Sequence, residues 1–213
     1  KSDFFFTQWN KTFFLAYLLK KKEKPLILVL KDNFTAQELE ESLIQLGIPA
    51  FALLDFDILP YEEENISFFI RKKRMEFFIA LLEKQKGVYL VPLKSYLFST
   101  PPLKEILNRT LNLQVGQKIS RKTLENTLIQ GGYTRLPHVE NPGDCTFRGE
   151  VVDIFPFHLE HPIRIDFFDD EIEKIRSFSQ TTQTSFQQSN ITNIMIYPLY
   201  EFMAHDSKMH QAF

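Results

Sequence analysis

The sequence predicts an α/β protein in two parts: a parallel-sheet part over residues 1–110 and an α+β part, rich in antiparallel strands, over residues 111–197. Before residue 110, nearly continuous apolar runs alternate with amphipathic segments, which is typical of a parallel sheet whose strands are buried on both faces. After it, short alternating runs are separated by turn residues, which indicates antiparallel strands. The last residues, 198–213, form too short a segment to assign from their own pattern.

The first part alternates strands and helices. After an amphipathic helix near the N-terminus, strands are predicted for three short apolar runs, residues 25–30, 49–54 and 87–92. Helices are predicted for four further segments, residues 37–46, 66–86, 94–98 and 103–109. Asp32 or Asn33, with Thr35, offers an N-cap for the first of these four helices, and Gly47 ends it. This βαβα order predicts an open parallel sheet.

The second part is predicted to hold one helix and several short strands. The helix is expected at residues 121–130, and the strands at residues 136–140, 146–155, 162–168, 171–178 and 193–198. Two aspartates at residues 169–170 supply a hairpin turn between two of these strands. The three-residue spacing of Ile172, Ile175 and Phe178 is not that of a regular strand, so it predicts a bulge near residues 173–174.

The composition excludes several classes of function. The chain has 213 residues, 44% hydrophobic and 24% charged, with a formal net charge of −2, so no overall basic field would attract DNA. Basic runs at residues 20–24 and 71–74 are interpreted as solvated helix surfaces, and a DNA-binding module is kept as an alternative. A single cysteine, Cys145, excludes a disulfide within the chain and fits a reducing cytoplasm. No apolar run is long enough to span a membrane.

Motifs for catalysis and cofactor binding are missing from the sequence. Neither the phosphate-binding loop GxxxxGK[ST] nor the dinucleotide motif GxGxxG occurs, and the turn after residues 25–30 has no glycine. His158 and His161 lack a third partner at zinc-ligand spacing, and the acidic loop at residues 55–64 lacks the glycine of a calcium loop. The sequence therefore predicts no cofactor, no metal and no catalytic residue in this chain. A divergent nucleotide hydrolase is the enzymatic alternative.

The strand predicted at residues 162–168 carries the strongest functional signal. Its apolar residues at positions 163, 165 and 167 share one face, while Arg164 and Asp166 share the other. Phe168 then falls on the polar face, beside Arg164, where a large aromatic side chain gains little for the fold. An exposed aromatic next to an arginine is the composition expected of a protein–protein anchor.

Arg148 is the remaining candidate. It is predicted to lie in the strand at residues 146–155, on one face with Glu150, Val152 and Ile154, and Gly149 beside it indicates close backbone approach or a bulge. If this strand neighbours the strand at residues 162–168, the two bring together one patch, formed by Arg148, Arg164, Asp166 and Phe168. A set of cross-strand ion pairs with a chance aromatic, worth about 0.2–1 kcal/mol per pair, explains the pattern equally well.

A series of short marks runs through residues 116–185. They are Gly132-Tyr133, Pro142-Gly143, Arg148-Gly149, Asp153–Pro156, Pro162–Arg164, Phe167-Phe168, Asp170–Ile172 and Thr182-Gln183. Looser marks in the preceding part are Leu59–Tyr61 and Tyr89–Ser95. With these marks the chain resembles the N-terminal region of the bacterial transcription-repair coupling factors. The resemblance covers nearly the whole chain and is weakest before residue 55.

The resemblance implies a fold and a partner. That region of the family is similar to UvrB of nucleotide excision repair: a RecA-like half domain without a working P-loop, followed by an inserted α+β domain. Residues 198–213 would begin the return into the RecA-like domain. In the family the inserted domain binds UvrA by imitating UvrB. The resemblance places that surface on four residues, Arg148, Arg164, Asp166 and Phe168.

The resemblance also implies what a longer protein would do. Members of the family act on RNA polymerase stalled at a lesion, using a C-terminal motor that moves on double-stranded DNA with ATP and magnesium. That motor is absent from this chain, so the expected role of the fragment is that of a non-catalytic adaptor that recruits UvrA. In the intact protein, a C-terminal domain is expected to mask the patch.

Overall fold

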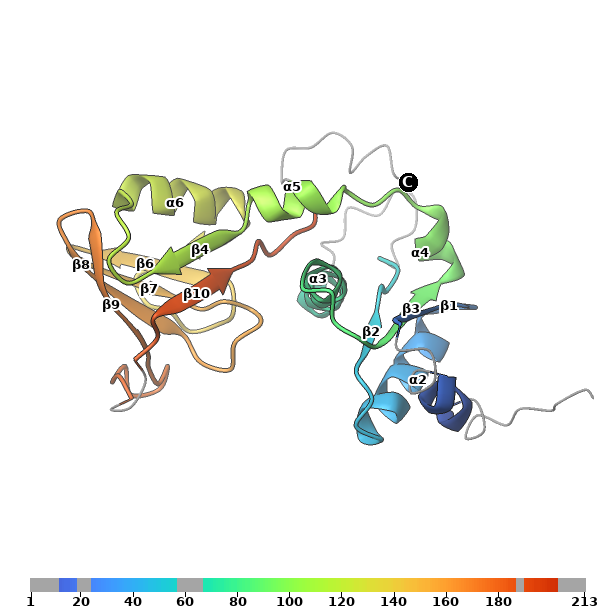
Figure 1. Ribbon diagram of the computed structural model, residues 1–213. Helices are drawn as coiled ribbons and strands as arrows, with labels where there is room; N and C mark the ends of the chain where they lie inside the picture. The colour runs from blue at the N-terminus through green and yellow to red at the C-terminus, as the bar shows by residue number, and fades with distance from the viewer. Residues whose placement is uncertain (1–11, 19–23, 57–66, 187–189, 203–213) are drawn as a thin grey trace, which may run out of the picture. The chain divides into compact units, whose positions relative to one another are not determined.

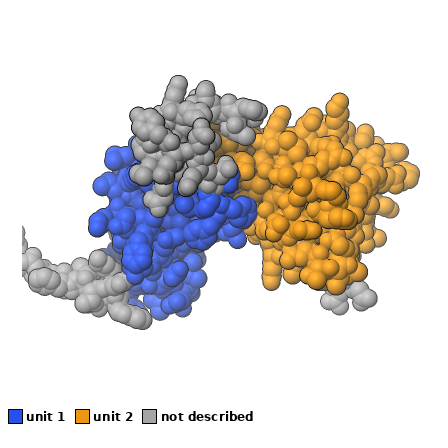
Figure 2. Space-filling model, turned by 180° about the vertical axis from the view of Figure 1, so that it is seen from behind, with its two compact units in different colours: residues 1–100, 212–213 blue, residues 101–211 orange. Residues whose placement is uncertain are grey.

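The computed structural model describes residues 12–18, 24–56, 67–186 and 190–202, which form two compact units (Figures 1 and 2). The division between the units falls between Thr100 and Pro101, whereas the sequence pattern predicts it near residue 110. The mark at residues 59–61 and most of the expected return segment, residues 203–213, lie outside the described residues. In the described part of the chain, no helix is both long enough and apolar enough to cross a membrane.

Unit 1 is built on a parallel sheet of three strands in the order β1-β3-β2 (Figure 1). The strands are β1 (Leu26–Leu30), β2 (Ala50–Ala52) and β3 (Val88–Pro92). The helices are α2 (Asn33–Gln45), α3 (Phe68–Leu82) and α4 (Leu93–Leu97), together with a helix at residues 12–18. The predicted alternation of strands and helices and the parallel pairing are therefore confirmed.

Two helices cover opposite faces of this sheet. Leu39 and Leu43 of α2 pack with Leu90 of β3 in one core cluster. On the other face Phe77 of α3 meets the Tyr89 ring edge-on, with ring centroids 5.3 Å apart. Successive residues of a strand point to opposite faces, so burying both Tyr89 and Leu90 requires a helix on each side. This explains why β3 is apolar at every position.

Unit 2 contains a short helix, a two-stranded ribbon, a second helix and a five-stranded sheet in the order β5-β6-β7-β8-β9 (Figure 1). The helices are α5 (Leu103–Asn108) and α6 (Arg121–Gln130), and the ribbon pairs β4 (Leu111–Gln114) with β10 (Asn193–Ile196). The sheet strands are β5 (Thr134–Arg135), β6 (Asp144–Arg148), β7 (Val151–Ile154), β8 (Ile163–Phe168) and β9 (Glu171–Ser177). The expected richness in antiparallel pairs is confirmed.

The segment predicted as one strand at residues 146–155 is a hairpin, so that prediction was wrong. Gly149 has a φ of 58°, which lets the chain reverse between β6 and β7, and a Cβ built there would meet nothing within 4 Å. The predicted close approach at Gly149 is therefore also wrong. Because of this turn, Arg148 lies at the end of β6, opposite Val151 of β7, and not within one long strand.

The strand predicted at residues 136–140 is also absent, since β5 covers only Thr134 and Arg135. The bulge is confirmed: Asp166 pairs with Lys174 while Phe167 pairs with Ile172, which leaves Glu173 unpaired. This extra residue explains the spacing of the two buried isoleucines of β9. Phe178 lies beyond the strand, in a small buried cluster with Val139 and Phe155.

Candidate partner-binding site

The patch lies on the face of the five-stranded sheet opposite α6. On β8, the side chains at 163, 165 and 167 are buried, while Arg164 and Asp166 are partly exposed and Phe168 is 70% exposed. Helix α6 covers the other face, where its Glu125 forms an ion pair with Arg135 of β5. We call the face that carries Arg164, Asp166 and Phe168 the polar face. The strand alternation predicted from sequence is therefore confirmed for this strand.

Asp153 of β7 is the centre of the polar face. Its side chain is 1% exposed and accepts three hydrogen bonds. Arg164 donates two of them, from Nε to Oδ1 (2.7 Å) and from Nη2 to Oδ2 (2.9 Å), and Arg148 donates the third from Nη2 to Oδ2 (2.7 Å). A fork of this kind fixes the orientation of a guanidinium group as well as its position. Asp153 therefore joins three strands through their side chains.

The surroundings of Arg164 explain how Asp153 can be buried. The guanidinium carbon of Arg164 lies 4.6 Å from the centre of the Phe178 ring, and its Nη1 donates to the Gln183 carbonyl (3.3 Å). Phe178 in turn packs with Val139 and Phe155 in the small apolar cluster. Hydrogen bonding to Asp153 raises the pKa of Arg164 above its usual value, because the bond favours the charged form.

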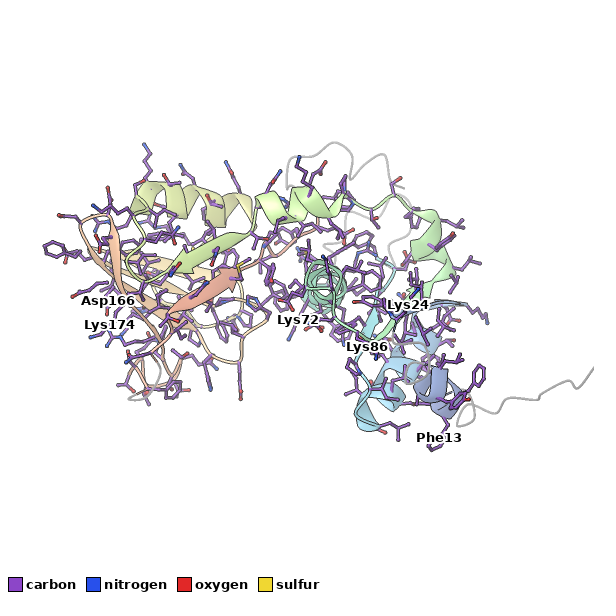
Figure 3. The ribbon with its side chains drawn as sticks, in the orientation of Figure 1. Phe13, Lys24, Lys72, Lys86, Asp166 and Lys174 are labelled. Atoms are coloured by element: carbon purple, nitrogen blue, oxygen red, sulfur yellow. The ribbon has the colours of Figure 1, made fainter. Side chains whose placement is uncertain are left out.

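The polar face is arranged in rows across the strands. Asp153, Arg164 and Arg176 of β9 occupy one row, since they are register partners. Asp166 lies in the next row beside Lys174, and Figure 3 labels both residues on their neighbouring strands. Asp166 accepts a hydrogen bond from Arg176 Nη2, not from the two candidate arginines.

Phe168 lies in a third row, farther from Arg164 than the sequence suggested. Two residues along an antiparallel strand span about 7 Å, so Phe168 is about 14 Å from Arg164, with Asp166 between them. The prediction that Phe168 lies beside Arg164 was therefore wrong, although both residues lie on the same face. The patch is therefore an elongated strip, with an apolar anchor at one end and paired arginines at the other.

The end of the strip that carries Phe168 is held in place by the chain around it. Phe167 N–H donates to the Glu150 carbonyl (2.8 Å), which ties β8 to the turn of the preceding hairpin. On the other side, Gly116 N–H donates to the Ile172 carbonyl (2.8 Å) and Ile119 N–H to the Asp170 carbonyl (2.8 Å). An exposed aromatic on a braced hairpin loses little conformational freedom on binding, which favours a role as an anchor.

The structure thus brings Arg148 and Arg164 together and places Asp166 and Phe168 on the same face. Sequence reasoning missed Asp153 and Arg176, which complete the two ion-pair clusters. Asp153 is part of the mark at residues 153–156, but the single-strand prediction gave no reason to place it between two arginines. Once the hairpin at Gly149 is recognised, alternation puts Asp153 on the same face as Arg148, and the register of β7 with β8 then places it opposite Arg164.

The carboxyl ends of the parallel strands in unit 1 are the usual nucleotide site of an open α/β sheet. Here Asp32 caps α2, accepting hydrogen bonds from the Thr35 N–H (2.9 Å) and hydroxyl (2.7 Å). The Asn33 side chain exchanges two hydrogen bonds with the main chain of Asp55, whose carboxylate lies 2.7 Å from Lys94 Nζ. A phosphate entering here would meet two carboxylates, which does not favour the nucleotide-hydrolase alternative.

The basic run at residues 71–74 is partly committed to the fold. Arg74 is 2% exposed, donates to the Leu54 carbonyl, and lies 4.0 Å from the centre of the Phe56 ring. Lys73 Nζ forms an ion pair with the buried Glu40 (3.0 Å). The other basic run, at residues 20–24, lies mostly outside the described residues. Arg74 and Lys73 are therefore engaged within the fold, which weakens the case for DNA binding through this run.

Comparison with known proteins identifies the unit that carries the patch. Residues 111–202 match the UvrB interaction domain family. The matched residues all lie in unit 2, which is therefore similar to that domain family. Along most of its length the chain is also similar to proteins named transcription-repair-coupling factor: 31% identical over 95% of the chain to that of Borreliella burgdorferi, 29% over 88% to that of Escherichia coli, and 28% over 91% to that of Bacillus subtilis.

These matches confirm the resemblance found in the sequence. The chain spans only 16–18% of the length of these three relatives. Whatever the rest of such a protein does therefore lies outside this chain. The region that matches the UvrB interaction domain family begins at β4 and includes all four residues predicted for the patch, since it covers residues 111–202.

Proposed function

We propose that this chain is a non-catalytic adaptor module that binds UvrA through the polar face of its UvrB interaction domain. The observation that carries the proposal is Phe168, which is 70% exposed on a strand whose other apolar side chains are buried. It shares its face with two arginines held by one carboxylate. Aromatic and arginine side chains dominate the energetics of protein–protein interfaces.

The proposal extends to the longer protein suggested by the relatives. There the module would bring UvrA to RNA polymerase stalled at a lesion, while a separate ATP- and magnesium-dependent motor acts on double-stranded DNA. Unit 1 would be the first part of a RecA-like domain that binds no nucleotide. A C-terminal domain of the same protein would cover the polar face until UvrA is needed. We also infer that the protein works in the cytoplasm.

Titration calorimetry of the 213-residue chain with purified UvrA tests the proposal. Phe168→Ala and Arg148→Ala should each weaken binding by about 2 kcal/mol, or about thirtyfold, because truncated interface anchors have effects of that size. The Phe168 side chain is 70% exposed and that of Arg148 is 46% exposed, so circular dichroism should show little change in the thermal unfolding of either variant.

The opposite face of the same sheet provides matched controls. Ile129 of α6 is an exposed apolar residue (45%), and Arg135 of β5 resembles Arg148 in exposure and in having one ion pair. Ile129→Ala and Arg135→Ala should leave the UvrA affinity unchanged. An affinity that is insensitive to Phe168→Ala and Arg148→Ala, or that falls equally in the control variants, would refute binding through the polar face.

A further inference from the structure

The two arginines of the patch are not equivalent in their surroundings. Arg164 is only 18% exposed in its side chain and uses three of its nitrogens in hydrogen bonds within the unit. Its flat face is covered by Phe178. Arg148 is 46% exposed and, among the residues that the structure describes, its side chain donates one hydrogen bond, from Nη2 to Asp153. The guanidinium group with donors available to a partner is therefore that of Arg148.

The charges at Asp153 are also unequal. Two guanidinium groups share one carboxylate, so the cluster keeps one net positive charge. Arg164 takes both oxygens of Asp153, while Arg148 shares only Oδ2. Since Arg164 and Asp153 are both covered, the excess charge is presented to solvent by Arg148. A partner that approaches the polar face would satisfy this charge with a carboxylate of its own.

Asp153 is too deeply buried to touch a partner itself, because its side chain is only 1% exposed. It nevertheless determines where Arg148 points. Arg148 lies at the end of β6, next to the hairpin turn, and a long side chain at such a place samples many rotamers unless a fixed group holds it. Arg164, held by Phe178 and Gln183, fixes Asp153, and Asp153 holds Arg148.

We propose that Asp153 is the positioning residue of the patch: it holds the guanidinium of Arg148 towards the partner, while Arg164 serves to fix Asp153. This inference rests on the proposed binding of UvrA through the polar face. It divides three of the four sequence candidates into partner-contacting residues, Arg148 and Phe168, and a supporting residue, Arg164. It adds Asp153, which contacts no partner atom, as a determinant of affinity.

Conservative variants separate positioning from charge. Arg148→Lys keeps the charge but loses the planar group that Asp153 orients, so it should keep only part of the UvrA affinity, whereas Arg164→Lys cannot form the two-point contact with Asp153 and should weaken binding nearly as much as Arg164→Ala. Asp153→Asn has the same shape but lacks the charge, and it should weaken binding about tenfold. If Arg164→Lys binds UvrA like the unaltered chain, Arg164 acts only as a charge and the inference is overturned.

A double-mutant cycle tests the coupling directly. Arg148→Ala should change the dissociation constant far less in the Asp153→Asn background than in the unaltered chain, because Arg148 is no longer oriented there. Independent, additive effects would overturn the inference. If Arg148→Ala and Phe168→Ala are themselves without effect while the chain stays folded, it is the proposed function that fails. The two failures are therefore distinguishable.

A measurement without UvrA covers the case in which Asp153→Asn does not fold. In the unaltered chain, nitrogen-15 NMR should show an Arg164 Nε–H that exchanges slowly with water, because this group donates to a buried carboxylate. The Nε–H of Arg135, on the other face, is the comparison. Equal, fast exchange of both groups would show that Asp153 does not hold Arg164 in solution and would overturn the inference.

Discussion

The ring of Tyr200 packs directly against the Cα of Gly132, with no room for a side chain between them. A Cβ built on Gly132 would fall inside the van der Waals radii of the Tyr200 ring carbons, and the φ of Gly132 is 92°. The segment that carries Tyr200 is tied down on both sides, since Leu199 N–H donates to the Gly131 carbonyl (2.7 Å) and Arg109 donates to the Tyr200 carbonyl (3.0 Å). Residues 199–202 are therefore part of unit 2, as are the other residues that match the UvrB interaction domain family.

Gly132→Ala should lower the free energy of unfolding by about 3 kcal/mol, since a left-handed backbone and an overpacked contact add their effects. Gly116 is the matched control because its φ is 84° but its Cβ would meet nothing within 4 Å. Gly116→Ala should cost only about 1 kcal/mol. Urea unfolding followed by circular dichroism measures both. Equal losses in the two variants would contradict the steric argument, and Tyr200→Ala should remove most of the difference.

The elements that sequence reasoning found are those whose pattern is fixed locally. The apolar runs of β1 and β3 and the alternation of β8 depend on burial alone. The extra residue in β9 is visible in the sequence as an irregular spacing of the apolar residues. The missed hairpin has a different cause. Residues 146–155 contain strand-forming residues on both sides of the turn, and the turn depends on Gly149 taking a positive φ with only Glu150 beside it.

The same missed turn hid Asp153, the centre of the polar face. Phe168 could be assigned to the polar face from its own strand, and the structure confirms its exposure. Asp153, in contrast, meets Arg164 only through the register of β7 with β8, which a single sequence does not contain when a hairpin is read as one strand. Arg176 reaches Asp166 only through the bulged pairing of β8 with β9. The ion pairs weighed against the anchor interpretation do exist, between partners other than those expected, and the exposed aromatic lies beside them.

The cap of α2 should make the stability of unit 1 depend on acid pH. Hydrogen bonds from the Thr35 N–H and hydroxyl lower the pKa of Asp32, since they favour the charged carboxylate. A lowered pKa in the folded state contributes stability above the unfolded value, about pH 4, and that contribution is lost as the pH falls through the folded value. An Asn side chain caps a helix about as effectively as Asp does, but it does not titrate.

The free energy of unfolding of Asp32→Asn should therefore match that of the unaltered chain in acid, and it should change less with pH. Urea unfolding at about pH 6 and about pH 3, followed by helical circular dichroism, measures the free energy of unfolding of both proteins. Between these conditions the unaltered chain should lose more stability than the Asn variant. Parallel losses in the two proteins would show that Asp32 does not titrate with folding.

Cys145 should be chemically inert in the folded chain. It is buried in β6, and burial, with a smaller contribution from Glu125, raises the pKa of its thiol to about 12. At about pH 8 the reactive thiolate is then about a thousandfold rarer than for an ordinary thiol with a pKa near 9. Iodoacetamide should label the native chain correspondingly slowly, and the urea-unfolded chain at the ordinary rate. Fast labelling of the native chain would contradict burial of this strand.

The raised pKa of Cys145 also has a consequence for stability in base. Folding favours the protonated thiol, so the stability it contributes is fully present below about pH 9 and is lost as the pH rises towards 12. Cys145→Ala removes the titrating group. The unaltered chain should therefore lose more stability than the variant between about pH 8 and about pH 10. The reverse order would mean that the thiolate, and not the thiol, is favoured by the fold.

Salt should separate the two ends of the polar face in its proposed binding to UvrA. Arg148 presents the one net positive charge of the Asp153 cluster, and the attraction of an exposed charge is screened within about 10 Å at 0.1 M salt. Phe168 contributes through burial of apolar surface, which ordinary salt does not screen. Arg148→Ala should therefore reduce the dependence of affinity on salt, whereas Phe168→Ala should weaken binding by the same factor at every salt concentration.

Calorimetric titrations at about 0.05, 0.15 and 0.5 M sodium chloride measure this difference. Arg135→Ala, on the face covered by α6, is the control for a general change in charge, and it should shift neither the affinity nor its salt dependence. Phe168→Ala should give a line parallel to that of the unaltered chain, displaced to weaker binding, and Arg148→Ala a shallower one. A shallower line for Phe168→Ala, or an unchanged slope for Arg148→Ala, would mean that the net charge at Asp153 is not what the partner meets.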